Sequence, residues 1–128
     1  PYTQVHPWGE SEMTLQVAVN ETNGRTVIAP KGRLDGLTSD TFVQEGQRAL
    51  GNAAGRYVLD LSQVPHVSSA GLRGILILAK AVRQANGALT VYLPEDNRMV
   101  RDVFRVSGFA NVITICATIE EALGPPAG

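Results

Sequence analysis

Two adjacent serines, Ser68 and Ser69, are the residues of this chain best placed to carry chemistry. They lie between an irregular stretch that follows Pro65 and a strongly helical segment, so they fall at the start of a helix. A hydroxyl at that position accepts a hydrogen bond from a free backbone N–H group, and Ser69 is the expected N-cap. A phosphate on the same hydroxyl would meet unpaired N–H groups and the positive end of the helix dipole. Ser69 is therefore predicted to be a capping residue or a phosphorylation site.

Four charged or titratable side chains near these serines have both structural and functional interpretations. Arg73 lies one helical turn after Ser69, where it would pair with a phosphate, bind an acidic partner surface, or remain in solvent. His66 precedes Ser69 by three residues and is expected to be a solvated loop side chain. Asp60 follows an apolar segment, and a partly buried carboxylate there must accept hydrogen bonds from loop amides. Asp35 is expected to cap or orient its own loop.

Serine, histidine and aspartate also make up the catalytic set of serine hydrolases, but their spacing here argues against catalysis. A nucleophile elbow needs glycine two residues before and two residues after the serine; Gly71 fills the second place, while Val67 occupies the first. His66 is poorly placed as a base because it lies in the same loop as Ser69. The sequence has no Gly-rich phosphate loop, no metal-spaced Cys/His cluster and no dinucleotide fingerprint. We therefore expect no enzymatic activity, no metal and no cofactor.

A phospho-acceptor receiver domain is a second alternative, because its acceptor aspartate ends a strand similar to the one before Asp60. A receiver also needs two acids after its first strand, which hold a magnesium ion together with the acceptor. The first predicted strand of this chain ends at Asn20-Glu21-Thr22, inside an apparent turn and without such a pair. The receiver interpretation is therefore disfavoured.

Length and composition predict one compact domain, with 128 residues of which 44% are hydrophobic and 18% charged. Eleven Lys and Arg against twelve Asp and Glu give a formal charge of −1, which disfavours direct nucleic-acid binding. No window of eighteen apolar residues occurs, so we expect a soluble protein without membrane contact. The single cysteine, Cys116, lies in an apolar run and is expected to be a small buried side chain in a reducing compartment.

Apolar periodicity predicts alternating strands and helices. Strands are expected at residues 13–20, 25–31, 56–61, 89–93 and 112–115, the first two joined by an Asn23-Gly24 turn. Helices are expected after a cap at Thr38, Ser39 or Asp40 as far as Gly51, with Gly46 as a weak point, and at residues 72–82, 99–106 and 119–123. The face of the second helix is expected to be Leu72, Ile75, Leu76, Ala79 and Val82.

This order of elements predicts an α/β fold: a mixed, mostly parallel sheet of about five strands packed with about four helices. Strand order does not follow from the pattern. In such sheets the functional surface lies at the carboxyl ends of parallel strands, where loops run into helix N-termini. The loops to consider are therefore residues 32–40, 62–71 and 94–98.

Residues 58–73, which read VLDLSQVPHVSSAGLR, resemble the signature of the STAS, or anti-sigma factor antagonist, family. Upstream, GRLD at residues 32–35 resembles the Gly-x-Leu-Asp turn of that family. Downstream, residues 103–109 and 112–123 are similar to its C-terminal motifs. The resemblance identifies residues 13–123 as a single STAS-like domain. Residues 1–12 are then a loose native arm or a leftover of cloning, and residues 124–128 a flexible tail.

The resemblance implies a regulator that binds an ATP-dependent anti-sigma kinase, thereby releasing a sigma factor, and that is inactivated when the kinase phosphorylates one serine. The serine of the family lies two residues before the glycine, which is Ser69 here. Ser68 stands where many members have Asp and is the alternative acceptor. The resemblance also implies a phosphoserine phosphatase and a bacterial cytoplasm. The expected partner-binding residues are Gly32, Leu34, Asp35, His66, Ser68, Ser69, Gly71, Leu72 and Arg73, extended by the turn at residues 32–40.

A scaffold or interaction subunit of a larger signalling assembly, without a phosphorylation switch, is the alternative function. Apolar surface outside the core would favour such assembly, whereas a polar rim around Ser69 would favour transient docking of a kinase. Self-association as a homodimer stays open.

Overall fold

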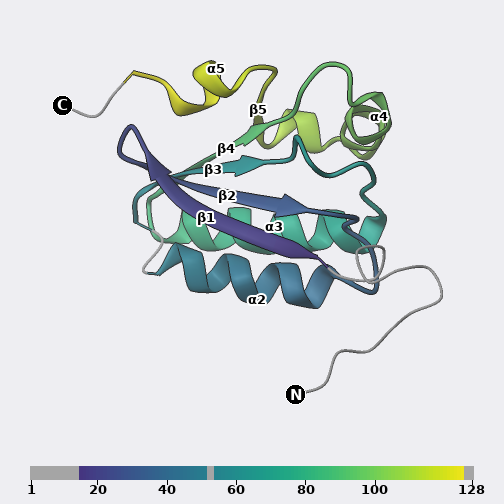
Figure 1. Ribbon diagram of the computed structural model, residues 1–128, viewed down its shortest axis with the longest axis horizontal. Helices are drawn as coiled ribbons and strands as arrows, with labels where there is room; N and C mark the ends of the chain where they lie inside the picture. Colours follow the sequence, from purple (N-terminus) through teal and green to yellow (C-terminus); the bar gives the residue numbers. More distant parts are fainter. Residues whose placement is uncertain (1–14, 52–53, 126–128) are drawn as a thin grey trace.

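The computed structural model describes residues 15–51 and 54–125, which form one sheet with helices on both faces (Figure 1). The strands are β1 (Gln16–Thr22), β2 (Arg25–Lys31), β3 (Arg56–Asp60), β4 (Ala88–Tyr92) and β5 (Thr114–Cys116). The helices are α2 (Ser39–Leu50), α3 (Ser69–Gln84), α4 (Arg98–Ser107) and α5 (Ile119–Leu123), with a 3₁₀ turn η1 (Phe109–Asn111) after α4. The predicted order of elements is confirmed, although the expected arm at residues 1–12 lies outside the described residues.

The five strands lie in the order β1-β2-β3-β4-β5. β1 pairs with β2 antiparallel through a two-residue turn, in which Asn23 and Gly24 have φ angles of 55° and 77°. Every other neighbouring pair is parallel. The sheet is therefore mixed and mostly parallel, as predicted, and the carboxyl ends of β2, β3 and β4 meet at one edge.

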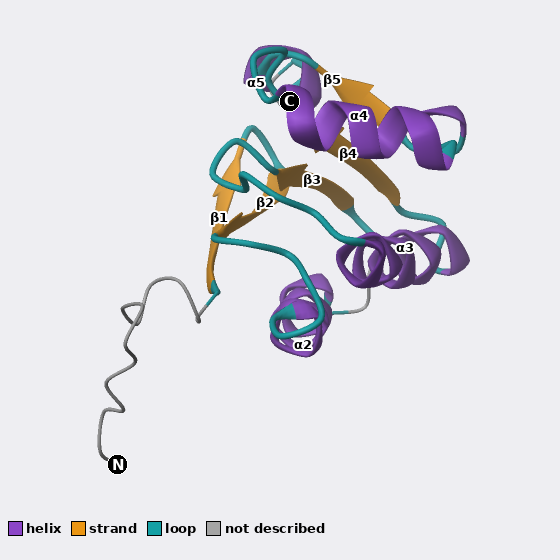
Figure 2. Ribbon diagram, turned by 90° about the vertical axis from the view of Figure 1, so that its right-hand side faces the viewer, coloured by secondary structure: helices purple, strands orange, loops and turns teal. Residues whose placement is uncertain are grey.

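Alternate side chains of the strands enter two separate cores. Ile28, Leu59 and Val91 face the larger core, which also holds Phe42 of α2, Ile75 of α3 and Phe104 of α4. On the other face α5 closes a smaller core formed by Val27, Val58 and Ala122. Figure 2 shows the resulting layers, with α2, α3 and α4 along one face of the sheet and α5 on the other.

The contact between α2 and α3 differs from its predicted form. Gly46, expected to weaken α2, is buried, and a Cβ atom there would collide with the Leu78 side chain of α3. Leu78 was not among the expected apolar positions of α3 but is 1% exposed, whereas Leu76 is only half-buried. The glycine therefore allows the two helices to approach closely.

The last strand begins two residues later than predicted. Gly108 adopts a left-handed conformation with φ of 83° and starts η1, and the Val112 N–H donates to the carbonyl of Phe109 at 3.0 Å. Residues 112–113 therefore complete a turn before β5 begins at Thr114. A left-handed glycine that opens a second short helix prevents extended backbone directly after α4.

One expectation near the C-terminal end is wrong. Cys116 is only half-buried, and partial burial together with the charge of Glu121 raises the pKa of its thiol. The flexible tail expected from residue 124 stays a prediction. At its first two residues the Gly124 N–H donates to the carbonyl of Glu120, and the Pro125 carbonyl accepts from Arg25. Residues 126–128 lie outside the described residues.

Candidate functional site

The loops that follow β2 and β3 are joined by backbone hydrogen bonds. Leu34 and Val67 form an isolated parallel bridge, in which the Leu34 N–H donates to the His66 carbonyl at 3.0 Å. The Ser68 N–H in turn donates to the Leu34 carbonyl at 2.9 Å, and the Gly32 N–H donates to the Gln63 carbonyl at 3.1 Å. The two motifs that carried the family resemblance therefore lie side by side and hold each other in place.

The third loop, between β4 and α4, is attached to the second by one side chain. The Asn97 amide donates to the Val64 carbonyl at 2.8 Å, and its oxygen accepts from the Val100 N–H at 3.4 Å as the N-cap of α4. Arg101 ties the same loop to α4 by donating to the carbonyls of Leu93 and Pro94. The carboxyl edge of the sheet is thus one connected surface formed by three loops.

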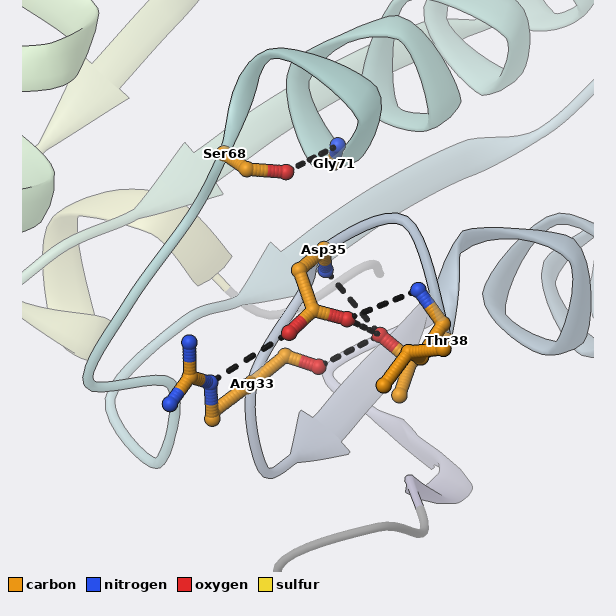
Figure 3. Close-up of polar contacts among 6 residues, drawn as sticks. Arg33, Asp35, Thr38, Ser68 and Gly71 are labelled. Carbon is orange, nitrogen blue, oxygen red and sulfur yellow. Dashed lines mark hydrogen bonds and ion pairs between the residues drawn. The ribbon is translucent and has the colours of Figure 1, made fainter.

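Within the first loop, polar side chains bond to one another and to their own backbone (Figure 3). The hydroxyl of Thr38, a residue that is 5% exposed, donates to the Arg33 carbonyl at 2.6 Å and accepts from the Asp35 N–H at 3.1 Å. The Asp35 carboxylate accepts from the Leu37 N–H at 3.0 Å and lies 3.3 Å from the Arg33 guanidinium. Asp35 therefore orients its own loop, as expected. Thr38 occupies the N-cap position of α2 without giving its side chain to the helix.

The start of α3 corrects the assignment of its cap. Ser68 is the N-cap, with φ of −91° and ψ of 178°, and its hydroxyl accepts from the Gly71 N–H at 3.3 Å (Figure 3). Ser69, the expected N-cap, is instead the first residue of the helix and is exposed. The shift has a tertiary cause, because the bond from the Ser68 N–H to Leu34 holds Ser68 in the extended conformation that an N-cap requires.

Three residues expected at the partner surface are buried beneath it. Leu34 is 0% exposed and Leu72 is 8% exposed. Gly71 is also buried, and a Cβ atom on it would collide with the carbonyl oxygen of Leu34. These residues hold the first turn of α3 against the first loop. They therefore position the exposed residues of this surface and do not themselves contact a partner.

The side chain of Ser69 makes no contact in the described structure that the fold depends on. Within residues 15–51 and 54–125, its hydroxyl has no hydrogen-bond partner, and the N–H groups of Ser69 and Ala70 have no acceptor. Arg73, one turn further along α3, is exposed and forms no ion pair within the same ranges. Free hydroxyl, free amides and a free guanidinium therefore lie close together on the first turns of α3.

The residues of the hydrolase alternative are not assembled as a triad. The Asp60 carboxylate accepts from the Ser62 N–H at 2.9 Å, which is the loop contact expected of it. In the part of the chain that the structure describes, no hydrogen bond joins Ser69, His66 and Asp60. The same part holds no group of three His, Cys, Asp or Glu residues suited to a metal ion. It also contains no helix that is both long and apolar enough to cross a bilayer.

An apolar groove of about 400 Å³ lies beside Ser69, between the start of α3 and α4. Its lining residues are Val67, Ser69, Leu72, Asp102, Val103, Val106 and Ser107. Val106 is 77% exposed, and Met99, one residue into the same helix, is 59% exposed. Both were expected among the apolar positions of α4, but only Val100 and Phe104 of that helix are buried.

Sequence reasoning missed this groove, although the sequence holds a signal for it. Val100 and Phe104 are spaced i, i+4 and form the buried face of α4. Met99, Val103 and Val106 are spaced i, i+4, i+7 and form a second apolar stripe on the same ten-residue helix. A short helix with two apolar stripes has more apolar surface than one core contact covers, and such surplus apolar surface is typical of binding sites.

Comparisons with known proteins agree on one family. The model of the STAS domain matches residues 16–122 of this chain. BtrV of Bordetella bronchiseptica, which carries the name of an anti-sigma factor antagonist, is 30% identical over 108 residues, covering 84% of this chain and 91% of BtrV.

Solved structures show the same fold at lower sequence identity. An anti-sigma factor antagonist from Mycobacterium paratuberculosis has a TM-score of 0.74 at 18% identity, over 94% of this chain and 96% of that one. The Bacillus cell fate determinant SpoIIAA in its phosphorylated form has a TM-score of 0.60 at 20% identity, over 84% of this chain and 96% of that one.

Proposed function

This chain belongs to the STAS domain family of anti-sigma factor antagonists, and we propose that it binds an anti-sigma factor kinase and is inactivated when that kinase phosphorylates Ser69. The family consists of non-enzymatic regulators. The observation that carries the proposal is the division of labour between the two serines: Ser68 caps α3, while the exposed Ser69 hydroxyl has no partner within the described residues. A kinase can modify that hydroxyl without breaking a bond that the fold needs.

The local structure accommodates a phosphate on Ser69. A phosphoserine carries a charge of about −1.5 to −2 at neutral pH and three acceptor oxygens. The N–H groups of Ser69 and Ala70 and the N-terminal end of α3 favour a negative charge at this position. Arg73, one turn away, adds a guanidinium that can pair with the phosphate. Phosphorylation therefore changes the surface while the helix stays folded.

The groove supplies the reason for partner release. A partner that packs against Val103 and Val106 must exclude water from the adjoining Ser69 hydroxyl. A phosphate there would have to lose its hydration before the contact could form. The proposed switch thus acts by the cost of desolvating a charge at an apolar contact.

The proposed partner surface extends over all three loops. Its apolar points are Leu37, which is 73% exposed in the first loop, and Met99 and Val106 of α4. Its polar points are Ser69 and Arg73, together with the half-exposed His66. We propose a kinase surface with apolar residues for the groove and an acidic residue for Arg73, a phosphatase that restores the serine, and the bacterial cytoplasm as the compartment.

Phosphosite mapping by mass spectrometry tests the site assignment. The chain and its Ser69→Ala and Ser68→Ala variants are isolated from growing and stressed source cells. We expect a stress-dependent phosphate on Ser69, lost in Ser69→Ala and retained in Ser68→Ala. A Ser69→Ala protein phosphorylated to the same extent as the natural chain would refute the assignment.

The scaffold function is kept as a second candidate because one observation favours it. The surface beside Ser69 is apolar rather than a polar rim, and apolar surface outside the core is typical of lasting assembly. The mapping experiment separates the two functions. A chain that is unmodified in every growth condition, yet recovered in a complex of fixed stoichiometry, would favour the scaffold.

A further inference from the structure

A second pocket lies at the opposite edge of the sheet, away from the loops of the proposed switch. The first residues of β2, β3 and β4 and the end of α5 surround about 330 Å³ of space. Its lining residues are Arg25, Arg56, Tyr57, Ala88, Thr90, Glu121, Ala122, Leu123, Gly124 and Pro125. Two arginines in one pocket bring two positive charges close together, which a negative charge nearby would have to balance.

Arg25 is a buried cation without an anionic partner in the described ranges. It is 6% exposed, and its Nη1 donates to the carbonyls of Asn23 and Pro125, both at 2.7 Å. These neutral acceptors leave the Nε and Nη2 donors of the guanidinium unused by the described residues. Every fully enclosed side-chain nitrogen of those residues has a partner, so the unused donors of Arg25 keep some accessible surface, and Arg25 lines the pocket.

Arg56 places a second positive charge beside the first. Thr26 pairs with Tyr57, and Val27 with Val58, so Arg25 and Arg56 start neighbouring strands one position earlier. Both arginines share the sheet face of Val27 and Val58, which pack against α5. Arg56 is exposed, and no ion pair or hydrogen bond of its side chain occurs within the described ranges. Adjacent like charges on one face repel unless an anion lies between them.

The remaining polar groups of the pocket do not supply that anion. Glu121 is its only acidic lining residue, and its exposed carboxylate accepts from the Thr118 hydroxyl at 3.1 Å. No ion pair links Glu121 to either arginine in the described structure. Thr90, half-buried on β4, adds a hydroxyl to the lining.

We infer that this pocket binds a small molecule through a phosphate group, either inorganic phosphate or a phosphate monoester. Guanidinium groups recognise oxyanions with paired, charge-assisted hydrogen bonds. Two guanidinium groups and a hydroxyl address several oxygens of a tetrahedral phosphate, whereas a planar carboxylate has only two. The volume lies at the lower end of the range for small-molecule sites. The ligand would tie the first hairpin to the end of α5 and would act independently of Ser69.

Two-dimensional ¹⁵N–¹H NMR of the full chain tests this inference. Inorganic phosphate, glycerol phosphate and acetate are titrated separately at constant ionic strength. We expect saturable shifts at Arg25, Arg56 and Thr90 with the two phosphate compounds, and at least about tenfold weaker binding of acetate. Tighter binding of glycerol phosphate than of inorganic phosphate would identify the ligand as a monoester, whereas tighter binding of inorganic phosphate would identify free phosphate.

Three variants give the test its controls. Arg56→Gln should weaken phosphate binding about tenfold, and the exposure of Arg56 keeps the fold intact. Arg83→Gln removes the same charge from an exposed position in the last turn of α3 and should leave the affinity unchanged. Glu121→Gln keeps a side-chain acceptor for Thr118, removes the one acid of the pocket, and should tighten binding.

The inference would be overturned if the NMR shifts did not saturate with phosphate. It would also be overturned if Arg56→Gln and Arg83→Gln lost phosphate affinity equally, because the effect would then be general charge screening. Shifts confined to Ser69 and Ala70 would also overturn it, because they would place the anion at the N-terminus of α3.

Discussion

The first turns of α2 and α3 meet at the same edge of the sheet, but the hydroxyl groups at the two helix starts serve different purposes. At α2, the buried Thr38 hydroxyl bonds to Arg33 and Asp35 and is fully used by its loop. At α3, the Ser68 hydroxyl caps the helix, while the next hydroxyl, that of Ser69, is exposed and has no partner in the described residues. The hydroxyl at the N-cap position of α2 is therefore occupied within its loop, whereas the Ser69 hydroxyl beside the cap of α3 is exposed and available.

This difference shows what makes a residue available for regulation. Adding a phosphate to Thr38 would break two hydrogen bonds inside the loop and force a charge into a buried space. Adding one to Ser69 breaks no bond among the described residues. A phosphorylation switch needs a hydroxyl that is rigidly positioned by structural neighbours but does not itself hold the fold. Four substitutions rank the residues of the two helix starts by their importance to the fold.

The largest effect is expected from Gly71→Ala. The added Cβ would collide with the carbonyl of Leu34, which is backbone and itself bonded to Ser68, so neither side can move cheaply. We expect a loss of about 3 kcal/mol in the free energy of unfolding, measured by urea denaturation.

Gly46→Ala is the matched control for that substitution. Its Cβ would meet the flexible end of the Leu78 side chain, and alanine improves helix propensity by about 1 kcal/mol. The net change should therefore be much smaller than for Gly71→Ala. Equal losses for the two variants would show that the contact of α3 with the first loop is no more rigid than an ordinary helix contact.

Thr38→Val should give the second largest effect. The substitution keeps the shape of the side chain but leaves the Asp35 N–H and the Arg33 carbonyl without their partner. We expect a loss of about 2 kcal/mol in the free energy of unfolding. Calorimetric unfolding would measure it, and a neutral result would contradict the structural role of the Thr38 hydroxyl.

Ser68→Ala should destabilise the protein by about 1 kcal/mol, because it removes the N-cap of α3. Hydrogen exchange should quicken at the Gly71 N–H, the group that donates to the cap, and change little at the start of α2. Unchanged exchange at Gly71 would argue that another group caps α3.

The smallest effect on stability is expected from Ser69→Ala, within about 0.5 kcal/mol, because its hydroxyl has no partner in the described structure. This expectation replaces the cost of a lost cap, which belongs to Ser68. The same variant should lose the regulatory phosphate completely. A Ser69→Ala protein as destabilised as Ser68→Ala would erase the distinction between the two serines.

Much of the fold could be predicted because local signals were strong. Asn23-Gly24 predicted the hairpin turn, and the short apolar run before Asp60 predicted a strand. Signals failed where a distant contact decided the outcome. Gly46, for example, is explained by its contact with Leu78 of α3. The late start of β5 has a local cause instead, because the left-handed Gly108 opens η1.

The candidate site also has features that local sequence signals predict and features that depend on distant contacts. The positions of Ser69 and the GRLD turn could be read from the sequence, including the role of Asp35 in its own loop. The second apolar stripe of α4 is visible in the sequence, but its place beside Ser69 is not, and neither is the bond from Asn97 to Val64, because each joins residues from separate loops or helices. The sequence also did not show that Leu34, Gly71 and Leu72 are buried. A motif does not distinguish its exposed residues from the buried residues that position them.

The order of strands and helices, the family motifs and the pair of serines at the start of α3 all follow from local sequence signals. These features depend on neighbours within a few residues: side-chain period, turn residues and capping chemistry. Long-range contacts, in contrast, set which serine caps the helix and which arginines share a pocket at the far edge of the sheet. The hydrogen bond from Ser68 to Leu34 and the register of β2 with β3 bring together residues more than thirty positions apart. Pairings of that range are set by the packing of the whole sheet.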